Sequence, residues 1–145
     1  MNLAQLIDPV VALAIEAGRA ILEVYASDFD VQAKDDESPI TKADMASHHI
    51  ILAGLQELTP DLPILSEESG LPDFEERSRW NPYWLIDPLD GTREFVNRNG
   101  EFTVNIALIE DHRPVLGVVH VPVRGTTYCG CQGFGAEKRV DGGQP

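Results

Sequence analysis

The sequence predicts an α+β fold in which two helices pack on a mainly antiparallel sheet. The N-terminal segment has apolar residues at three- and four-residue steps, the spacing of an amphipathic helix. A second helical segment follows it. Several short runs of β-branched and aromatic residues, separated by turn residues, come after both. This order, with helices first and strands later, is typical of a layered α+β domain.

Composition fits one domain and argues against several classes of protein. Hydrophobic residues make up 43% of the 145 residues, enough to build a core. The formal charge of −13 argues against a nucleic-acid polymer as partner, because such binding needs a basic face. No apolar run approaches the roughly 20 residues that cross a bilayer, and we expect no secretory signal. Cys129 and Cys131 are interpreted as reduced thiols of a cytosolic protein.

The first helix is expected over Leu3 to about Tyr25. Pro9 is compatible only with the start of a helix, so the regular part is expected from Asp8. Residues 27–39 are polar and predict an exposed loop. The apolar stripe of the helix consists of Leu3, Leu6, Ile7, Val10, Ala14, Ala17 and Ile21.

The second helix is expected to begin at Thr41, because Thr41 and Asp44 have the spacing of a capping box. Thr59-Pro60 is expected to end it. The sequence then predicts an exposed loop over 72–82, a turn over 87–92 and a final loop over 133–145. The predicted strands cover 63–66, 83–86, 102–108, 115–121 and 128–130, with a hairpin connection at 111–114.

Two acidic clusters follow predicted strands and are the candidate functional residues. Glu67-Glu68 follows strand 63–66, and Asp87 with Asp90 follows strand 83–86. Strand ends are places where a rigid scaffold presents functional groups, and hard divalent cations such as Mg²⁺ prefer oxygen ligands. Each cluster has an ordinary alternative, because Asp-Gly is a common turn dipeptide and Glu67-Glu68 could be a solvated loop.

The turn after the second cluster has the composition to bring oxygen atoms together. Pro88 stiffens it, and Gly91 permits unusual dihedral angles. Such a turn can direct both carboxylates and the carbonyl of Leu89 into the same space. Two carboxylates that close repel each other unless a cation lies between them.

These motifs resemble those of the inositol monophosphatase superfamily, the lithium-sensitive, Mg²⁺-dependent phosphatases. The resemblance covers essentially the whole chain and rests on TKAD at 41–44, SEE at 66–68 and WLIDPLDGT at 84–92. Arg93-Glu94-Phe95 and the stretch 98–109 make the chain most similar to the bacterial 3'(2'),5'-bisphosphate nucleotidases of that superfamily. The implied fold is the N-terminal half of a layered α/β sandwich.

The resemblance implies a set of metal ligands. Glu67, Asp87 and the Leu89 carbonyl would bind a first Mg²⁺, and Asp87 would bridge to a second that Asp90 also binds. Asp44 matches an acid near a third, weaker metal position. Mn²⁺ is an expected substitute for Mg²⁺.

The remaining implied roles concern water and phosphate. Thr92 would orient the attacking water, with Glu67 or Asp44 as its proton acceptor. The backbone N–H groups of Gly91 and Thr92 would bind the phosphate. Arg93 is a further candidate for phosphate contact, as are Lys34 and Lys42, with ordinary surface charge as the alternative for all three.

The implied reaction is hydrolysis of adenosine 3',5'-bisphosphate (3'-phosphoadenosine 5'-phosphate) to AMP and phosphate, in the service of sulfate assimilation. The implied location is the cytoplasm, either free or peripheral at the inner face of the cell membrane. Activity as an inositol-1-monophosphatase or related sugar phosphatase is the first alternative. An inactive metal- or nucleotide-binding fragment is the second.

One departure from the family pattern concerns length. Family members are much longer, and their second half supplies a further aspartate in a Trp-Asp motif; here Trp80 precedes Asn81 and Trp84 precedes Leu85. We therefore expect residues 1–145 to be the N-terminal metal-binding domain of a longer phosphatase, with the C-terminal domain absent. A short paralogue with the first metal site only is the alternative. The isolated chain is expected to show little or no phosphatase activity and to self-associate through exposed apolar surface.

Overall fold

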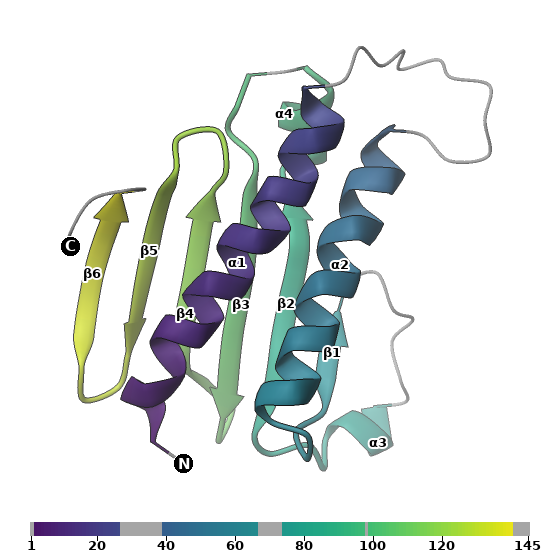
Figure 1. Cartoon of the computed structure of the whole chain (residues 1–145). Coiled ribbons are helices and arrows are strands. Elements are labelled where there is room, and N and C mark those ends of the chain that lie inside the picture. Colours follow the sequence, from purple (N-terminus) through teal and green to yellow (C-terminus); the bar gives the residue numbers. More distant parts are fainter. Residues whose placement is uncertain (1, 27–38, 67–73, 98, 141–145) are drawn as a thin grey trace.

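The structure, a computed structural model, describes residues 2–26, 39–66, 74–97 and 99–140. Its helices are α1 (Leu3–Tyr25), α2 (Pro39–Leu58), α3 (Phe74–Arg77) and α4 (Thr92–Val96). Its strands are β1 (Ile64–Ser66), β2 (Tyr83–Asp90), β3 (Thr103–Glu110), β4 (Arg113–Val121), β5 (Thr126–Cys131) and β6 (Gly135–Val140). They form one sheet in sequence order, with β1 parallel to β2 and every later pair antiparallel. Helices α1 and α2 lie side by side on one face of it (Figure 1), which confirms the predicted fold class.

The core lies between the two long helices and the face of the sheet that they cover. The predicted stripe of α1 is buried from Leu6 to Ile21, while Leu3 packs at its margin. The helix spans Leu3–Tyr25, which confirms the predicted bounds, whereas the narrower start at Asp8 drawn from Pro9 is wrong. Burial of Leu6 and Ile7 extends the helix before Pro9 although the proline removes one N–H donor.

Helix α2 begins two residues before the expected position, at Pro39. Thr41 therefore lies in the first turn of the helix and not ahead of it, so the predicted start at Thr41 is wrong. Close contact between the two helices depends on Gly54, because a Cβ atom there would lie 2.0 Å from Cδ2 of Leu13.

More residues form strands of the sheet than the sequence predicts. Strand β2 continues through Asp90 where a turn was expected, and residues 135–140 form β6 where a loop was expected. Strand β6 has mostly exposed side chains and lacks an apolar pattern, and its pairing with β5 holds it in place. Arg139 also donates to Asp8 of α1 at 2.8 Å. Helices α3 and α4 were likewise not predicted.

The other face of the sheet, which we call the outer face, is not covered by α1 or α2. Large apolar side chains on it are more than a third exposed, namely Leu85 (39%), Val119 (38%) and Tyr128 (47%). Cys129 and Cys131 lie two residues apart on β5 and both point to the opposite face, where they are buried and free. No helix in the described part of the chain is long and apolar enough to span a bilayer.

Candidate metal centre

A β-bulge near the end of β2 brings Asp87 and Asp90 onto the same face of the sheet. Asp87 pairs with Asn105 of β3, and Asp90 pairs with Thr103, so three steps along β2 match two steps along β3. In a regular strand, residues three apart point to opposite faces, and one extra residue restores the same side. The burial pattern agrees, because Pro88 and Leu89 are consecutive buried residues. Both carboxylates therefore lie on the outer face.

Two polar residues of β3 join the carboxylates on the outer face. The hydroxyl of Thr103 donates to Oδ1 of Asn105 at 3.0 Å, and Nδ2 of Asn105 donates to Oδ2 of Asp90 at 3.1 Å. This chain of hydrogen bonds orients the Asp90 carboxylate. Thr103 and Asn105 are not among the site residues that the sequence predicts. Their two-residue spacing in a strand next to β2 was the available signal, but it gains meaning only with the register.

The segment after Asp90 is held in a conformation that requires glycine. Gly91 has φ 98° and ψ 53°, in the left-handed region, as the sequence predicted. A Cβ atom there would also lie 3.2 Å from Cα of Phe102 and from Oε2 of Glu94. Because Phe102 presents backbone at this point, the close approach cannot be relieved by a rotamer change.

Aromatic packing fixes the short helix α4 that follows Gly91. Phe95 is fully buried, and its ring centroid lies 5.4 Å from those of Tyr25 and Phe102. The Tyr25 and Phe102 rings are 5.0 Å apart. The three rings join α1, α4 and the start of β3, so the turn at Gly91 is anchored from both sides.

Asp44 reaches the same end of the sheet from the helix layer. The first half of α2 lies beside the end of β2, as Figure 1 shows. Asp44 is half-buried, and its Oδ1 atom is shielded from solvent. The structure thus brings Asp44, Asp87 and Asp90 to one end of the sheet. Within the described ranges, however, no three His, Cys, Asp or Glu side chains group closely enough to hold one ion.

The other predicted site residues that the structure describes lie on α4, α2 and β2. Thr92 and Arg93 are exposed on α4, and Lys42 is exposed on α2. The Leu89 side chain is apolar and buried, so its backbone carbonyl oxygen is the group that could bind a metal ion. Glu67, Glu68 and Lys34 lie outside the described residues.

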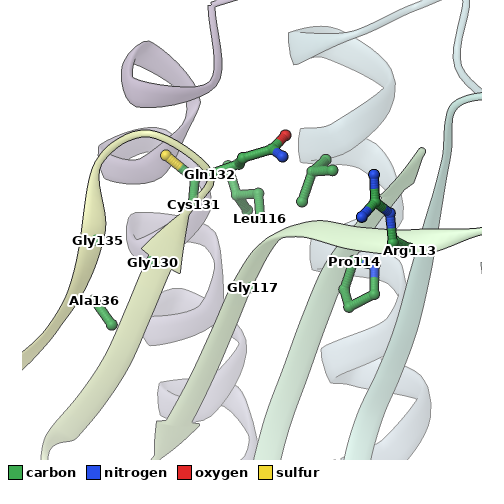
Figure 2. Close-up of a pocket in the computed structure, with 10 residues that line it drawn as sticks. Arg113, Pro114, Leu116, Gly117, Gly130, Cys131, Gln132, Gly135 and Ala136 are labelled. Carbon is green, nitrogen blue, oxygen red and sulfur yellow. The ribbon is translucent and has the colours of Figure 1, made fainter. Parts of the chain in front are cut away.

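Two shallow grooves run along the outer face and meet at Gly117. One, of about 340 Å³, is lined mainly by apolar residues of β2, β3 and β4, with Asp87 and Asn105 among its polar lining. The other, of about 450 Å³, is flanked by Arg113 and Pro114 on one side and by β5 and β6 on the other (Figure 2). The second groove has no carboxylate in its lining. Of these two grooves, only the first therefore borders an acidic residue of the candidate site, Asp87.

Comparison with known proteins bears on the chemistry of this arrangement. The model of the inositol monophosphatase family matches residues 2–142. The 3'(2'),5'-bisphosphate nucleotidase CysQ of Escherichia coli O157:H7 is 54% identical over 130 residues, which cover 88% of this chain and 52% of that protein. The protein of the same name from Aggregatibacter actinomycetemcomitans is 46% identical over 137 residues, with 94% and 51% coverage. The chain spans about half the length of the curated relatives it matches.

Solved structures agree with the sequence relatives. CysQ from Bacteroides thetaiotaomicron superposes with a TM-score of 0.83 at 46% identity, covering 91% of this chain and 48% of that one. Inositol monophosphatase from Anabaena (Nostoc) sp. PCC 7120 superposes with a TM-score of 0.78 at 29% identity, covering 97% and 50%. The likeness therefore extends over nearly all of this chain.

Proposed function

Because the chain belongs to the inositol monophosphatase family, we propose that it provides the metal-binding half of a Mg²⁺-dependent 3'(2'),5'-bisphosphate nucleotidase. The reaction is hydrolysis of adenosine 3',5'-bisphosphate to AMP and phosphate in the cytoplasm, as a step linked to sulfate assimilation. The observation that carries the proposal is the bulge that turns Asp87 and Asp90 to one face. Residues 1–145 are in this view the N-terminal domain, and a second domain completes the substrate pocket.

The donor chemistry of the site fits a hard divalent cation. The available ligands are the carboxylates of Asp87 and Asp90 and the carbonyl of Leu89, which all bind a metal through oxygen. Glu67, assigned from the family motif, is the proposed additional carboxylate. Bound Mg²⁺ would lower the pKa of a coordinated water and neutralise charge on the phosphate oxygens.

The chain's own residues perform the remaining tasks in this proposal. The Asp90 carboxylate is held in orientation by Asn105. The hydroxyl of Thr92 orients the attacking water, and Asp44 or Glu67 accepts its proton. The N–H groups of Gly91 and Thr92 donate to the phosphate, and the exposed Arg93 contacts it electrostatically.

Relatedness favours the nucleotide over inositol phosphate as substrate. Identity to the nucleotidase of E. coli O157:H7 is 54%, against 29% to the inositol monophosphatase of Anabaena. The deciding assay compares phosphate release from adenosine 3',5'-bisphosphate and from inositol 1-phosphate. We expect faster turnover of the nucleotide, and faster turnover of inositol phosphate would reassign the substrate.

A chimera tests whether this chain supplies the metal-binding half. The aligned 130 residues of the E. coli O157:H7 nucleotidase would be replaced by those of this chain. We expect the chimera to hydrolyse adenosine 3',5'-bisphosphate with Mg²⁺, and Asp87→Asn to remove most of that activity. Asp111→Asn, at an exposed acid of the β3–β4 hairpin, is the matched control. A folded but inactive chimera, or full activity of Asp87→Asn, would contradict the proposal.

A further inference from the structure

We infer that Ser47 of α2 is a positioning residue for the metal site. Its buried hydroxyl fixes the Pro88–Leu89 bulge and thereby keeps Asp87 and Asp90 on one face of the sheet. The inference rests on the proposed function, since it assigns a purpose to the bulge. It adds a residue of the helix layer that does not itself contact metal or substrate.

The contact between Ser47 and the bulge joins two layers of the fold. Ser47 is fully buried, and its Oγ donates to the carbonyl oxygen of Pro88 at 2.7 Å, across 41 residues of sequence. Pro88 and Leu89 have no register partners in β3. Pro88 also has no N–H to donate. The Pro88 carbonyl is thus held by a side chain of the helix layer at the point where the register with β3 is interrupted.

The next residue of α2 makes an equivalent contact with the neighbouring strand. A ring nitrogen of His48, Nδ1, lies 3.0 Å from Oγ of Ser66, the last residue of β1, and both residues are buried. Ser66 pairs with Ile86, the residue before Asp87. Two consecutive residues of α2 therefore contact both parallel strands where these approach their ends.

Loss of the Ser47 hydroxyl would leave a buried carbonyl without this hydrogen bond. A buried acceptor that lacks a hydrogen-bond partner is costly. The Pro88 peptide is therefore expected to rotate or shift toward another donor. Because Asp87 and Asp90 flank the bulge, such a shift changes the relative orientation of their carboxylates. Outer-shell partners of metal ligands alter metal affinity about 10- to 100-fold when removed.

An isosteric pair of variants separates the hydroxyl from the packing. Ser47→Thr and Ser47→Val introduce side chains of nearly the same shape, and only the first retains a hydroxyl donor. Ser47→Ala removes the donor without adding volume. Thr127→Val, which breaks another buried hydrogen bond, at 2.8 Å to His120 on β4, is the control for stability loss far along the sheet.

The readout is the dissociation constant for Mn²⁺, measured by electron paramagnetic resonance on the 145-residue chain, with circular dichroism to verify folding. We expect Ser47→Val and Ser47→Ala to bind Mn²⁺ at least about tenfold more weakly than Ser47→Thr. Thr127→Val should bind like the wild-type chain. Equal affinities of the Thr and Val variants would overturn the inference while leaving the metal site intact. Failure of the wild-type chain to bind Mn²⁺ would instead overturn the proposed site, and the inference with it.

Discussion

Substitution of Gly91 by alanine tests the geometry that follows the two aspartates. Two independent penalties apply, because Gly91 has φ 98° and because a Cβ atom would lie 3.2 Å from the backbone of Phe102. A left-handed conformation costs an L-residue about 1–2 kcal/mol. Crowding against atoms that cannot rotate away adds roughly 1–3 kcal/mol. We therefore expect Gly91→Ala to lower the free energy of unfolding by about 2–5 kcal/mol.

Gly133→Ala is the control that separates the two penalties. Gly133 also has positive φ, at 85°, but a Cβ atom there meets nothing within 4 Å. Only the backbone cost of about 1–2 kcal/mol should apply. With an unfolding entropy of about 0.3 kcal/mol per kelvin for a chain of this size, the melting temperature should fall by about 7–17 °C for Gly91→Ala and about 3–7 °C for Gly133→Ala.

Urea unfolding followed by circular dichroism measures both variants. The difference between the two losses of unfolding free energy measures the crowding at Phe102. We expect it to be at least about 1 kcal/mol. Equal losses would show that the backbone of Phe102 does not lie against Gly91. The close packing of the turn against the start of β3 would then be wrong.

Three further predictions concern the core and the buried thiol. Gly54→Ala should destabilise the chain by about 1–3 kcal/mol, and adding Leu13→Ala should recover part of the loss in a double-mutant cycle; additive losses would argue against the helix contact. Thr59→Val removes the acceptor of the Trp84 indole N–H, a bond of 2.8 Å, and should cost about 1–2 kcal/mol in thermal unfolding, whereas an unchanged melting temperature would count against that bond. Burial raises the pKa of the Cys129 thiol, so the folded chain holds this proton more tightly than the unfolded chain does. The contribution of this thiol to the free energy of unfolding is complete below the ordinary thiol pKa of about 8.5. It is lost as the pH rises through the raised pKa of the folded chain. Urea midpoints from pH 7 upward should therefore fall less steeply for Cys129→Ala, and parallel profiles would exclude the effect.

Sequence periodicity predicted the layers of the fold because its signals are local. The stripe of α1 and the alternation of β3 and β4 depend on neighbours three to four, or two, residues away. Strand β6 was missed because backbone pairing and the contact of Arg139 with Asp8 hold it, and neither leaves an apolar pattern. Charged side chains on an edge strand are common and resemble those of a loop.

The geometry of the candidate site also depends on long-range pairing that local sequence signals do not reveal. Asp87 and Asp90 could be selected from composition and motif, but their spacing was interpreted as a turn. The structure has a bulged strand there, because pairing of Asp87 and Asp90 with β3 continues on both sides of Pro88–Leu89. In a sequence Pro88 suggests a turn, but proline also occurs at β-bulges. Only the long-range register distinguishes the two.

Crystallography with Mn²⁺ tests the central claim most directly, namely that Asp87 and Asp90 share a divalent-cation site. Crystals of the chain grown with Mn²⁺ should show an anomalous difference peak within about 2.5 Å of a carboxylate oxygen of each residue. A peak elsewhere on the chain, or carboxylates that point away from each other with no peak between them, would contradict the account.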